Sequence, residues 1–188
     1  GYYELVAGSF SSDFENSKET GKNLGLENDR IYKTYQEMAE KESTRVDGID
    51  VVSIVTPNHL HVPIAKIFAE NGIHIICDKP IGMSSKEAID LKKVIESKKL
   101  IFALTHNYTG YPMVRHARSL VQKGDLGSLR VIQAEYPQDW LTTKVEDSGL
   151  KQAEWRTDPN RSGAGGCIGD IGTHAYNLIR FITGLEVD

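Results

Sequence analysis

Three side chains in this sequence have the chemistry needed to hold and transfer a proton. Lys79 stands in the run Ile-Ile-Cys-Asp-Lys-Pro (75–80), directly after apolar residues typical of a strand. Asp170 and His174 lie much later, within Gly-Asp-Ile-Gly-Thr-His. An ammonium, a carboxylate and an imidazole that meet in one cleft can take the proton of a reacting hydroxyl. We therefore predict a proton-handling site that contains Lys79, Asp170 and His174.

Asp170 and His174 are four positions apart, so they share one face if this segment is a helix. Glycines just before them would let the backbone approach a ligand closely. A purely structural interpretation also fits, since a carboxylate near a helix N-terminus is favoured by the helix dipole and a histidine can simply pack. The glycines are Gly163, Gly165, Gly166 and Gly169.

Lys79 also has two interpretations. It can form a surface ion pair with its neighbour Asp78, which would contribute little to stability. A lysine at the carboxyl end of a strand in a parallel sheet, however, stands where ligands bind, and it can polarise a hydroxyl there. The predicted position of Lys79 favours the second interpretation.

The first half of the chain alternates strand-like and helix-like segments. Apolar, β-branched runs of strand length are separated by segments with helical spacing, and several of these begin with capping residues such as Thr34 or Ser84. Strands are predicted at 3–9, 49–55, 73–77 and 100–104, and helices at 12–24, 34–43, 62–71 and 88–98.

This alternation predicts an α/β fold with a parallel sheet, because parallel neighbours need a crossover and apolar strands must be covered on both faces. Ligands bind such sheets beyond the carboxyl ends of the strands. Residues 56–61, 78–80 and 105–108 each follow an apolar strand, so we expect all three segments at one edge.

The pattern changes after Pro112, and we expect a second domain, so that residues 1–108 form one domain and 109–188 the start of another. A helix is predicted at 113–123, a partly exposed strand at 128–136 and a closing helix at 170–183. Residues 137–167 show little periodicity, and a loop of that length is usually functional.

The composition excludes several classes of protein. Charges of both signs are mixed at a formal net charge of -4, so we expect no nucleic-acid partner. Cys77 and Cys167 cannot form a disulfide framework or a four-thiolate zinc site, and His59 and His61 lack the acidic or thiol neighbours of a metal site. We predict no metal, no membrane span, and a soluble protein of the cytoplasm.

No G-x-G-x-x-G phosphate-binding loop or P-loop occurs in the sequence. A dinucleotide-binding fold would therefore lack its first strand, turn and helix. The simplest explanation is that these elements precede Gly1 in a longer protein, and we expect the chain to be a piece that also lacks a C-terminal part.

Short motifs that follow one another along nearly the whole chain resemble those of the Gfo/Idh/MocA family, the glucose-fructose oxidoreductase and inositol dehydrogenase group. Each motif is short, but their order and spacing together carry the resemblance. The motifs are Thr-Pro-Asn-His-Leu-His (56–61), Gly-Ile-His-Ile-Ile-Cys-Asp-Lys-Pro (72–80), Trp-Arg (155–156), Gly-Gly (165–166) and Asp-Ile-Gly-Thr-His (170–174).

The resemblance implies an incomplete Rossmann-type parallel sheet, followed by the start of an α/β substrate domain whose open sheet is mainly antiparallel. It implies Lys79, Asp170 and His174 as catalytic residues, with Asp-Lys-Pro in place of the family's Glu-Lys-Pro. Residues placed against the cofactor are Ser9, Ser11, Thr56, Pro57, Asn58, His61, Asp78, Lys79 and Pro80. Looser matches, assigned to the substrate, are Asn107, Tyr108, Arg156 and Tyr176.

The implied activity is hydride transfer between NAD or NADP and a secondary alcohol of a sugar, inositol or related polyol, in a protein that forms a homo-oligomer at full length. Ser9–Ser12 stand where an acidic residue usually contacts the ribose, and no arginine stands there for a 2'-phosphate, so both cofactors remain open. A non-catalytic nucleotide- or sugar-binding sensor and an inactive fragment are alternatives. Tyr136, Gln138, Trp140 and Arg161 suit sugar contacts, or they cap a sheet edge.

Overall fold

The computed structural model describes residues 2–187, which fall into two compact units. The first unit contains the residues up to 55 together with 60–77 and 85–103. The second contains 56–59, 78–84 and the chain from 104 onwards. The second unit therefore gathers the segments that directly follow the predicted strands.

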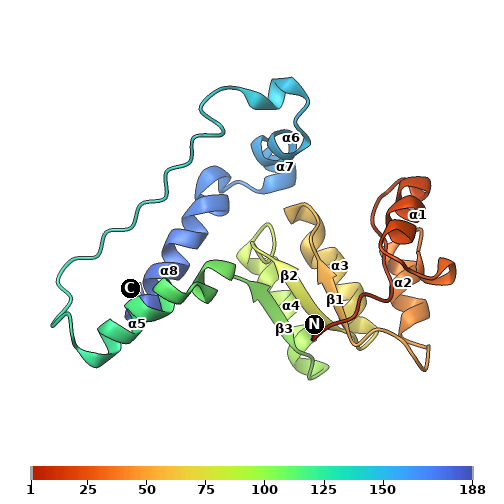
Figure 1. Ribbon diagram of the computed structural model, residues 1–188, viewed down its shortest axis with the longest axis horizontal. Helices are drawn as coiled ribbons and strands as arrows, with labels where there is room; N and C mark the ends of the chain where they lie inside the picture. The colour runs from red at the N-terminus through yellow and green to blue at the C-terminus, as the bar shows by residue number, and fades with distance from the viewer. Residues whose placement is uncertain (1, 188) are drawn as a thin grey trace. The chain divides into compact units, whose positions relative to one another are not determined.

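Three strands form a sheet in the order β1-β2-β3 (Figure 1). The sheet is parallel, as predicted. They are β1 (Val51–Ile54), β2 (His74–Asp78) and β3 (Phe102–Thr105). Val51 lies opposite His74 and Ile54 opposite Cys77. Since the strands are parallel, all three end at the same edge of the sheet.

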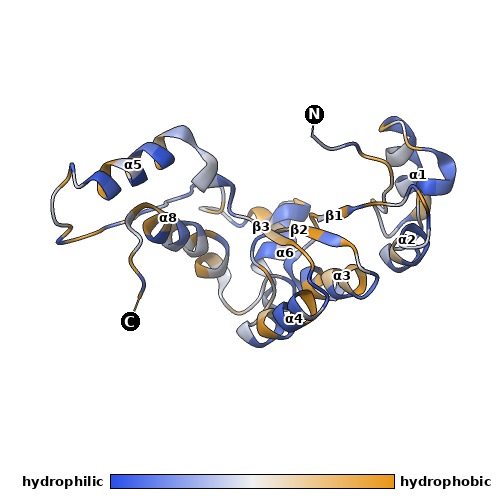
Figure 2. Ribbon diagram, turned by 90° about the horizontal axis from the view of Figure 1, so that it is seen from below, coloured by the Kyte–Doolittle hydropathy of each residue, from blue (hydrophilic) through white to orange (hydrophobic). Residues whose placement is uncertain are grey.

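Two helices connect these strands, α3 (Asn58–Glu70) and α4 (Ser85–Ser97). On α3, Val62, Ala65 and Phe68 are buried, and they form one core with the buried residues of β1 and β2. α4 is amphipathic, with Leu91 and Ile95 buried and charged residues elsewhere (Figure 2). The helix predicted at 62–71 begins four residues earlier, at Asn58.

Two short helices precede the sheet, α1 (Phe14–Asn23) and α2 (Tyr35–Glu42). The Asp13 carboxylate accepts the Glu15 N–H at 2.9 Å, and the Thr34 hydroxyl oxygen accepts the Glu37 N–H at 3.1 Å. These bonds satisfy amide groups that a helix leaves unpaired at its start. The predicted cap at Thr34 is confirmed, and Asp13 caps the first helix, which begins two residues after its predicted start.

The strand predicted at 3–9 is wrong. Only Gly8 pairs, through an isolated parallel bridge in which its N–H donates to Arg30 and its C=O accepts from Tyr32. Tyr2 and Tyr3 are fully or largely exposed. A strand needs a neighbour for its backbone groups, and within the described residues this segment has one only at Gly8.

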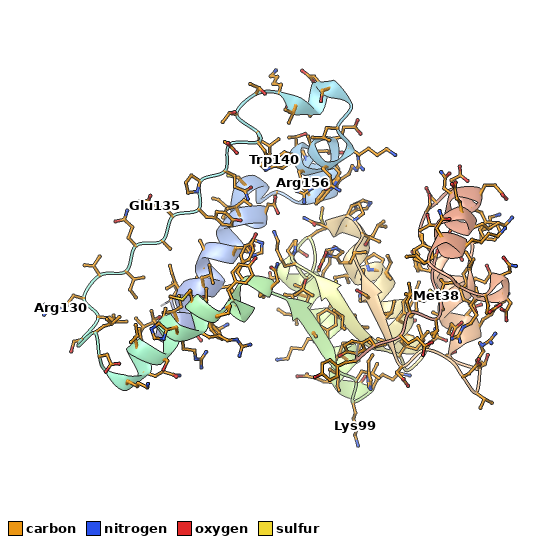
Figure 3. The ribbon with its side chains drawn as sticks, viewed as in Figure 1. Met38, Lys99, Arg130, Glu135, Trp140 and Arg156 are labelled. Atoms are coloured by element: carbon orange, nitrogen blue, oxygen red, sulfur yellow. The ribbon has the colours of Figure 1, made fainter. Side chains whose placement is uncertain are left out.

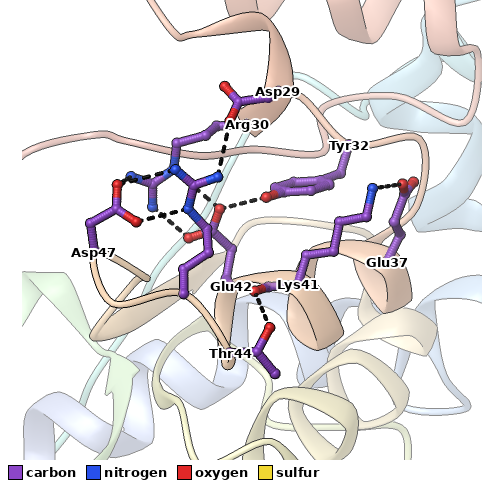
Figure 4. Close-up of polar contacts among 9 residues, drawn as sticks. Asp29, Arg30, Tyr32, Glu37, Lys41, Glu42, Thr44 and Asp47 are labelled. Carbon is purple, nitrogen blue, oxygen red and sulfur yellow. Dashed lines mark hydrogen bonds and ion pairs between the residues drawn. The ribbon is translucent and has the colours of Figure 1, made fainter.

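A buried ionic cluster joins the 3-10 turn η1 (Asn28–Arg30) to α2 (Figure 4). The Arg30 guanidinium donates to both carboxylate oxygens of Glu42, with Nε at 3.1 Å from Oε1. The Tyr32 hydroxyl donates to the same Oε1 at 2.6 Å. Burial, this hydrogen bond and the charge of Glu42 raise the pKa of Tyr32 well above its usual range. The cluster therefore holds a fully paired charge inside the first unit.

The second unit contains mainly helices and turns. α5 (Pro112–Lys123) and α8 (Thr173–Thr183) pack together, and the Arg118 guanidinium donates to the Phe181 carbonyl at 3.0 Å. Gly124 ends α5 in the left-handed conformation, directly after the predicted helix at 113–123. The remaining elements are η2 (Asn107–Gly110), η3 (Val145–Ser148), α6 (Lys151–Thr157), α7 (Pro159–Ser162) and the π-helical turn η4 (Ile168–Gly172).

Three predictions for the second unit are wrong in detail. Residues 128–136 are not a strand, because no segment of the described chain pairs with them. The predicted loop at 137–167 contains α6 and α7. The predicted helix at 170–183 is divided, since Asp170 lies in the π-helical turn and α8 begins at Thr173.

The Arg30–Glu42 pair gives a stability prediction. Replacing Glu42 by Ala leaves the buried Arg30 charge with only the Asp47 carboxylate at 3.5 Å, and the Tyr32 hydroxyl without its acceptor, which should lower the free energy of unfolding by about 3 kcal/mol. Urea unfolding followed by circular dichroism measures this. The control is Lys86→Gln, which removes the exposed ion pair to Asp90 and should cost less than about 1 kcal/mol. An equal loss of unfolding free energy in the two variants would contradict a stabilising role of the buried cluster.

Candidate active site

The second unit brings Lys79 and Asp170 into direct contact. The ammonium nitrogen of Lys79 lies 2.6 Å from Oδ1 of Asp170 and also donates to the Asp170 backbone carbonyl. The two side chains are only 14% and 26% exposed. The neighbouring Asp78 carboxylate accepts the Thr105 hydroxyl at 2.6 Å.

A tight backbone turn presents Asp170 to Lys79. The π-helical turn η4 follows a glycine-rich stretch, and a Cβ added at Gly165 would lie 3.1 Å from the backbone of Gly169. Only glycine fits such an approach without a shift of the chain. The close approach here is between two parts of the backbone, and the predicted approach of these glycines to a ligand stays a prediction. π-helical turns of this kind are frequent at functional sites.

Asp170 is held as a carboxylate. Burial by itself would raise its pKa, but the hydrogen bond and charge of Lys79 and the charge of Arg156 outweigh burial and hold the pKa of Asp170 below its usual range. Asp170 is thus a fixed anion at neutral pH and not a proton donor.

His174 lies in the first turn of α8 and is only 7% exposed. Burial, the positive charge of Lys79 and the nearby His106 lower the pKa of His174, and the charge of Asp170 only partly opposes them. The imidazole is therefore neutral at neutral pH, which is the form that can accept a proton.

Two tyrosines stand beside this imidazole. The Tyr108 ring centroid is 4.5 Å from that of His174, and the Tyr108 and Tyr136 hydroxyls lie 2.8 Å apart. This hydrogen bond, together with burial, raises the pKa of Tyr108 to about 12. Tyr108 therefore remains protonated and gives the site an aromatic wall with a hydrogen-bonding edge.

His106 joins the site although the sequence motifs did not single it out. Its ring lies edge-on to that of His174, with centroids 6.4 Å apart. Burial and the charge of Lys79 lower its pKa, and its buried Nδ1 has no hydrogen-bond partner within residues 2–187. The available signal was position, because His106 follows β3 directly, in the segment expected at the edge of the sheet.

Arg156 approaches Asp170 from α6. Its Nε is 3.2 Å from Oδ2 of Asp170, the oxygen that Lys79 does not hold. Figure 3 shows Arg156 beside Trp140. The two residues also line a cavity of about 690 Å³, together with Asn58, Tyr136, Gln138, Trp155 and residues of 162–172.

The residues predicted to contact the cofactor fall in both units. Asn58 is buried in the second unit, where its amide donates to the Ser162 carbonyl at 3.0 Å, and the Lys79–Pro80 peptide bond is cis. Thr56, Pro57 and Asp78 are in the same unit. Ser9, Ser11 and the buried His61 belong to the first unit.

Two residues predicted to contact substrate, Asn107 and Tyr176, are more exposed than the residues around Lys79 and Asp170. Asn107 is exposed on η2, and Tyr176 is 44% exposed on α8. The site therefore gathers Lys79, Asp170 and His174 with Tyr108 and Arg156.

Two candidate features are not found among the described residues. No group of three or more His, Cys, Asp or Glu side chains there has the arrangement of a metal site. Nor does any helix in 2–187 have both the length and the apolar character needed to cross a membrane.

The structure combines a parallel sheet and crossover helices with an ion pair between Lys79, at the end of β2, and Asp170, near the neutral imidazole of His174. Residues 3–106 match the family described as "Oxidoreductase family, NAD-binding Rossmann fold", and residues 114–188 match the GFO/IDH/MocA C-terminal domain. The chain belongs to the Gfo/Idh/MocA oxidoreductase family. The predicted resemblance is confirmed.

Individual relatives support this assignment. Levoglucosan dehydrogenase of Pseudarthrobacter phenanthrenivorans is 35% identical over 136 residues, which are 72% of this chain and 33% of that enzyme. The crystal structure of an oxidoreductase from Sinorhizobium meliloti is 48% identical, with a TM-score of 0.84, and the match covers 100% of this chain and 47% of that one.

A third relative was solved with a cofactor. An inositol dehydrogenase homolog complexed with NAD+ from Azotobacter vinelandii is 32% identical, with a TM-score of 0.92, and the match covers 97% of this chain and 46% of that one. The chain thus spans about half the length of the relatives with solved structures.

The electrostatic coupling in this site gives a testable prediction. Replacing Lys79 by Met removes the cation that lowers the pKa values of both Asp170 and His174, so both pKa values should rise. NMR titration of the Asp170 carboxyl carbon and the His174 ring measures them. Lys123→Met, which removes an exposed cation of α5, serves as the control and should leave both unchanged. Unchanged pKa values of Asp170 and His174 in the Lys79→Met protein would refute the electrostatic coupling of these groups to Lys79.

Proposed function

We propose that the whole protein is an NAD(P)-dependent oxidoreductase that transfers hydride between the nicotinamide cofactor and a secondary alcohol of a sugar, inositol or related polyol. The observation that carries the proposal is the Lys79–Asp170 ion pair beside the buried, neutral imidazole of His174. A cation and a base on one hydroxyl group are what alcohol oxidation needs when no metal takes part.

The roles of the side chains follow from their charges. His174, which is neutral at neutral pH, accepts the proton of the substrate hydroxyl. Lys79 donates a hydrogen bond to the same oxygen and stabilises the negative charge that develops on it. Asp170 keeps the ammonium in place through their ion pair. In the reverse direction His174 returns the proton to the carbonyl oxygen.

The residues at the strand ends fit a nicotinamide cofactor. His106 follows β3 and has a buried, unpartnered Nδ1, and His59 in the first turn of α3 has another. Buried polar atoms of this kind normally have a partner, so a bound group with polar edges would satisfy them. Thr56, Asn58, Lys79 and their neighbours would hold the nicotinamide end, while Ser9, Ser11 and His61 are the remaining proposed contacts. NAD(P), when bound, supplies or accepts the hydride.

The substrate class rests on the cavity and on the relatives. Indole and tyrosine rings line the cavity, and such surfaces suit the apolar faces and hydroxyl edges of a sugar ring. The relatives include a levoglucosan dehydrogenase and an inositol dehydrogenase homolog. Asn107, Tyr108 and Tyr176 are proposed contacts to this substrate.

The proposal extends to the organisation of the whole protein. We place the boundary between the nucleotide-binding and substrate domains near residue 109, between the segments that match the two domains of the family. In residues 128–136, Val131 and Ile132 are exposed. We propose that this segment becomes a strand of the open, mainly antiparallel sheet in the whole protein, which we expect to be a homo-oligomer of the cytoplasm.

A non-catalytic sensor of the same fold is the second candidate. It would keep the cavity and the cofactor contacts but would not need a paired lysine and a buried imidazole. The presence of Lys79, Asp170 and His174 together favours the enzyme.

Replacing Lys79 by Ala in the whole protein tests the enzyme directly. The variant should lose turnover by at least about a hundredfold, because the developing charge on oxygen is no longer stabilised, while NAD(H) or NADP(H) binding measured by nicotinamide fluorescence persists. A panel of sugars and inositols, each assayed with both cofactors, supplies the substrate, and Lys123→Ala is the control. Retained turnover would contradict the role of Lys79, and cofactor binding without turnover in the unaltered protein would favour the sensor.

A further inference from the structure

We propose that Arg156 is a positioning residue of this active site, which acts through Asp170 and not by contact with the substrate. The proposal rests on the proposed function insofar as Asp170 orients Lys79. The two oxygens of the Asp170 carboxylate are divided between two cations, with Lys79 on Oδ1 at 2.6 Å and Arg156 Nε on Oδ2 at 3.2 Å. A carboxylate held at both oxygens cannot rotate without breaking an ion pair.

Arg156 is itself fixed by its surroundings. Its Nη1 donates to the Gln152 carbonyl at 3.2 Å and to the Gln152 side-chain oxygen, one turn earlier on α6. Its guanidinium carbon lies 4.2 Å from the Trp155 ring centroid and 5.7 Å from that of Trp140. A planar guanidinium bonded along its edge and packed against indole faces has little freedom to follow a ligand.

The second cation changes the charge of the site. Lys79 and Asp170 alone form a neutral pair, whereas Lys79, Asp170 and Arg156 together carry one net positive charge. Other groups that face Asp170 are His174 from α8, neutral at neutral pH, and the protonated Tyr108 from η2. Since Arg156 shares the carboxylate, the ammonium of Lys79 is less fully neutralised and can stabilise an alkoxide more strongly.

Arg156→Gln in the whole protein tests this role. Loss of a charge-assisted hydrogen bond should reduce kcat on the order of tenfold to a hundredfold, with KM for the alcohol and cofactor binding little changed. The acid limb of the pH profile should move to higher pH, and NMR of the Asp170 carboxyl carbon should report a raised pKa, because one of its two cations is gone. Arg156→Lys should recover part of kcat.

The matched control is Arg180→Gln on α8, which removes an arginine paired with Glu186. It should leave kcat and the Asp170 titration unchanged. An Arg156→Gln protein that raises KM alone, with Asp170 titrating as before, would overturn the proposal and make Arg156 a substrate contact. An Arg156→Gln protein whose kcat and Asp170 titration match those of the Arg180→Gln protein would overturn the proposal as well.

Two features keep the test decisive. If Arg156→Gln does not fold, the Arg156→Lys protein tests the proposal instead. A wild-type kcat in Arg156→Lys would refute a role for the guanidinium geometry. A reduced kcat with unchanged KM would support that role. The Asp170 titration needs no turnover. Absence of dehydrogenase activity would therefore refute the proposed function, while the titration still decides whether Arg156 acts on Asp170.

Discussion

The ion pair between Lys79 and Asp170 is the contact on which the site depends. It joins the end of β2 to a π-helical turn far along the chain, and both side chains are largely withdrawn from solvent. Two charges removed from water are stable only when each is well paired. The glycine-rich turn before Asp170 and the cation of Arg156 both serve that pairing.

The Lys79–Asp170 pair also influences the protonation state of the His174 imidazole. A lysine that remains charged beside a buried histidine opposes its protonation. In the proposed reaction, Lys79 would both prepare His174 as a base and stabilise the oxygen that loses its proton. Asp170 alone would have the opposite effect on His174. Charge placement, more than any single contact, therefore makes this arrangement suited to alcohol chemistry.

Much of the first unit was predictable because its signals are local. The apolar runs of β1, β2 and β3 and the capping residues Asp13 and Thr34 act over a few residues. The wrong strand predictions concern segments that lack a pairing strand among the described residues. Residues 128–136 have strand-like alternation but no pairing segment within residues 2–187. The contact of Arg156 with Asp170 was not predicted, and its expected contact with substrate stays a prediction. The buried Nδ1 of His106 could not be foreseen from composition.

We propose that Lys79 and His174 converge on one reacting oxygen while Asp170 holds the lysine. A crystal structure of the whole protein with its nicotinamide cofactor and a polyol tests it most directly. We expect the secondary hydroxyl within hydrogen-bond distance of Lys79 Nζ and of a His174 ring nitrogen, with the Lys79–Asp170 pair intact. A bound polyol with its reacting hydroxyl away from His174, or a Lys79 turned away from Asp170, would contradict it.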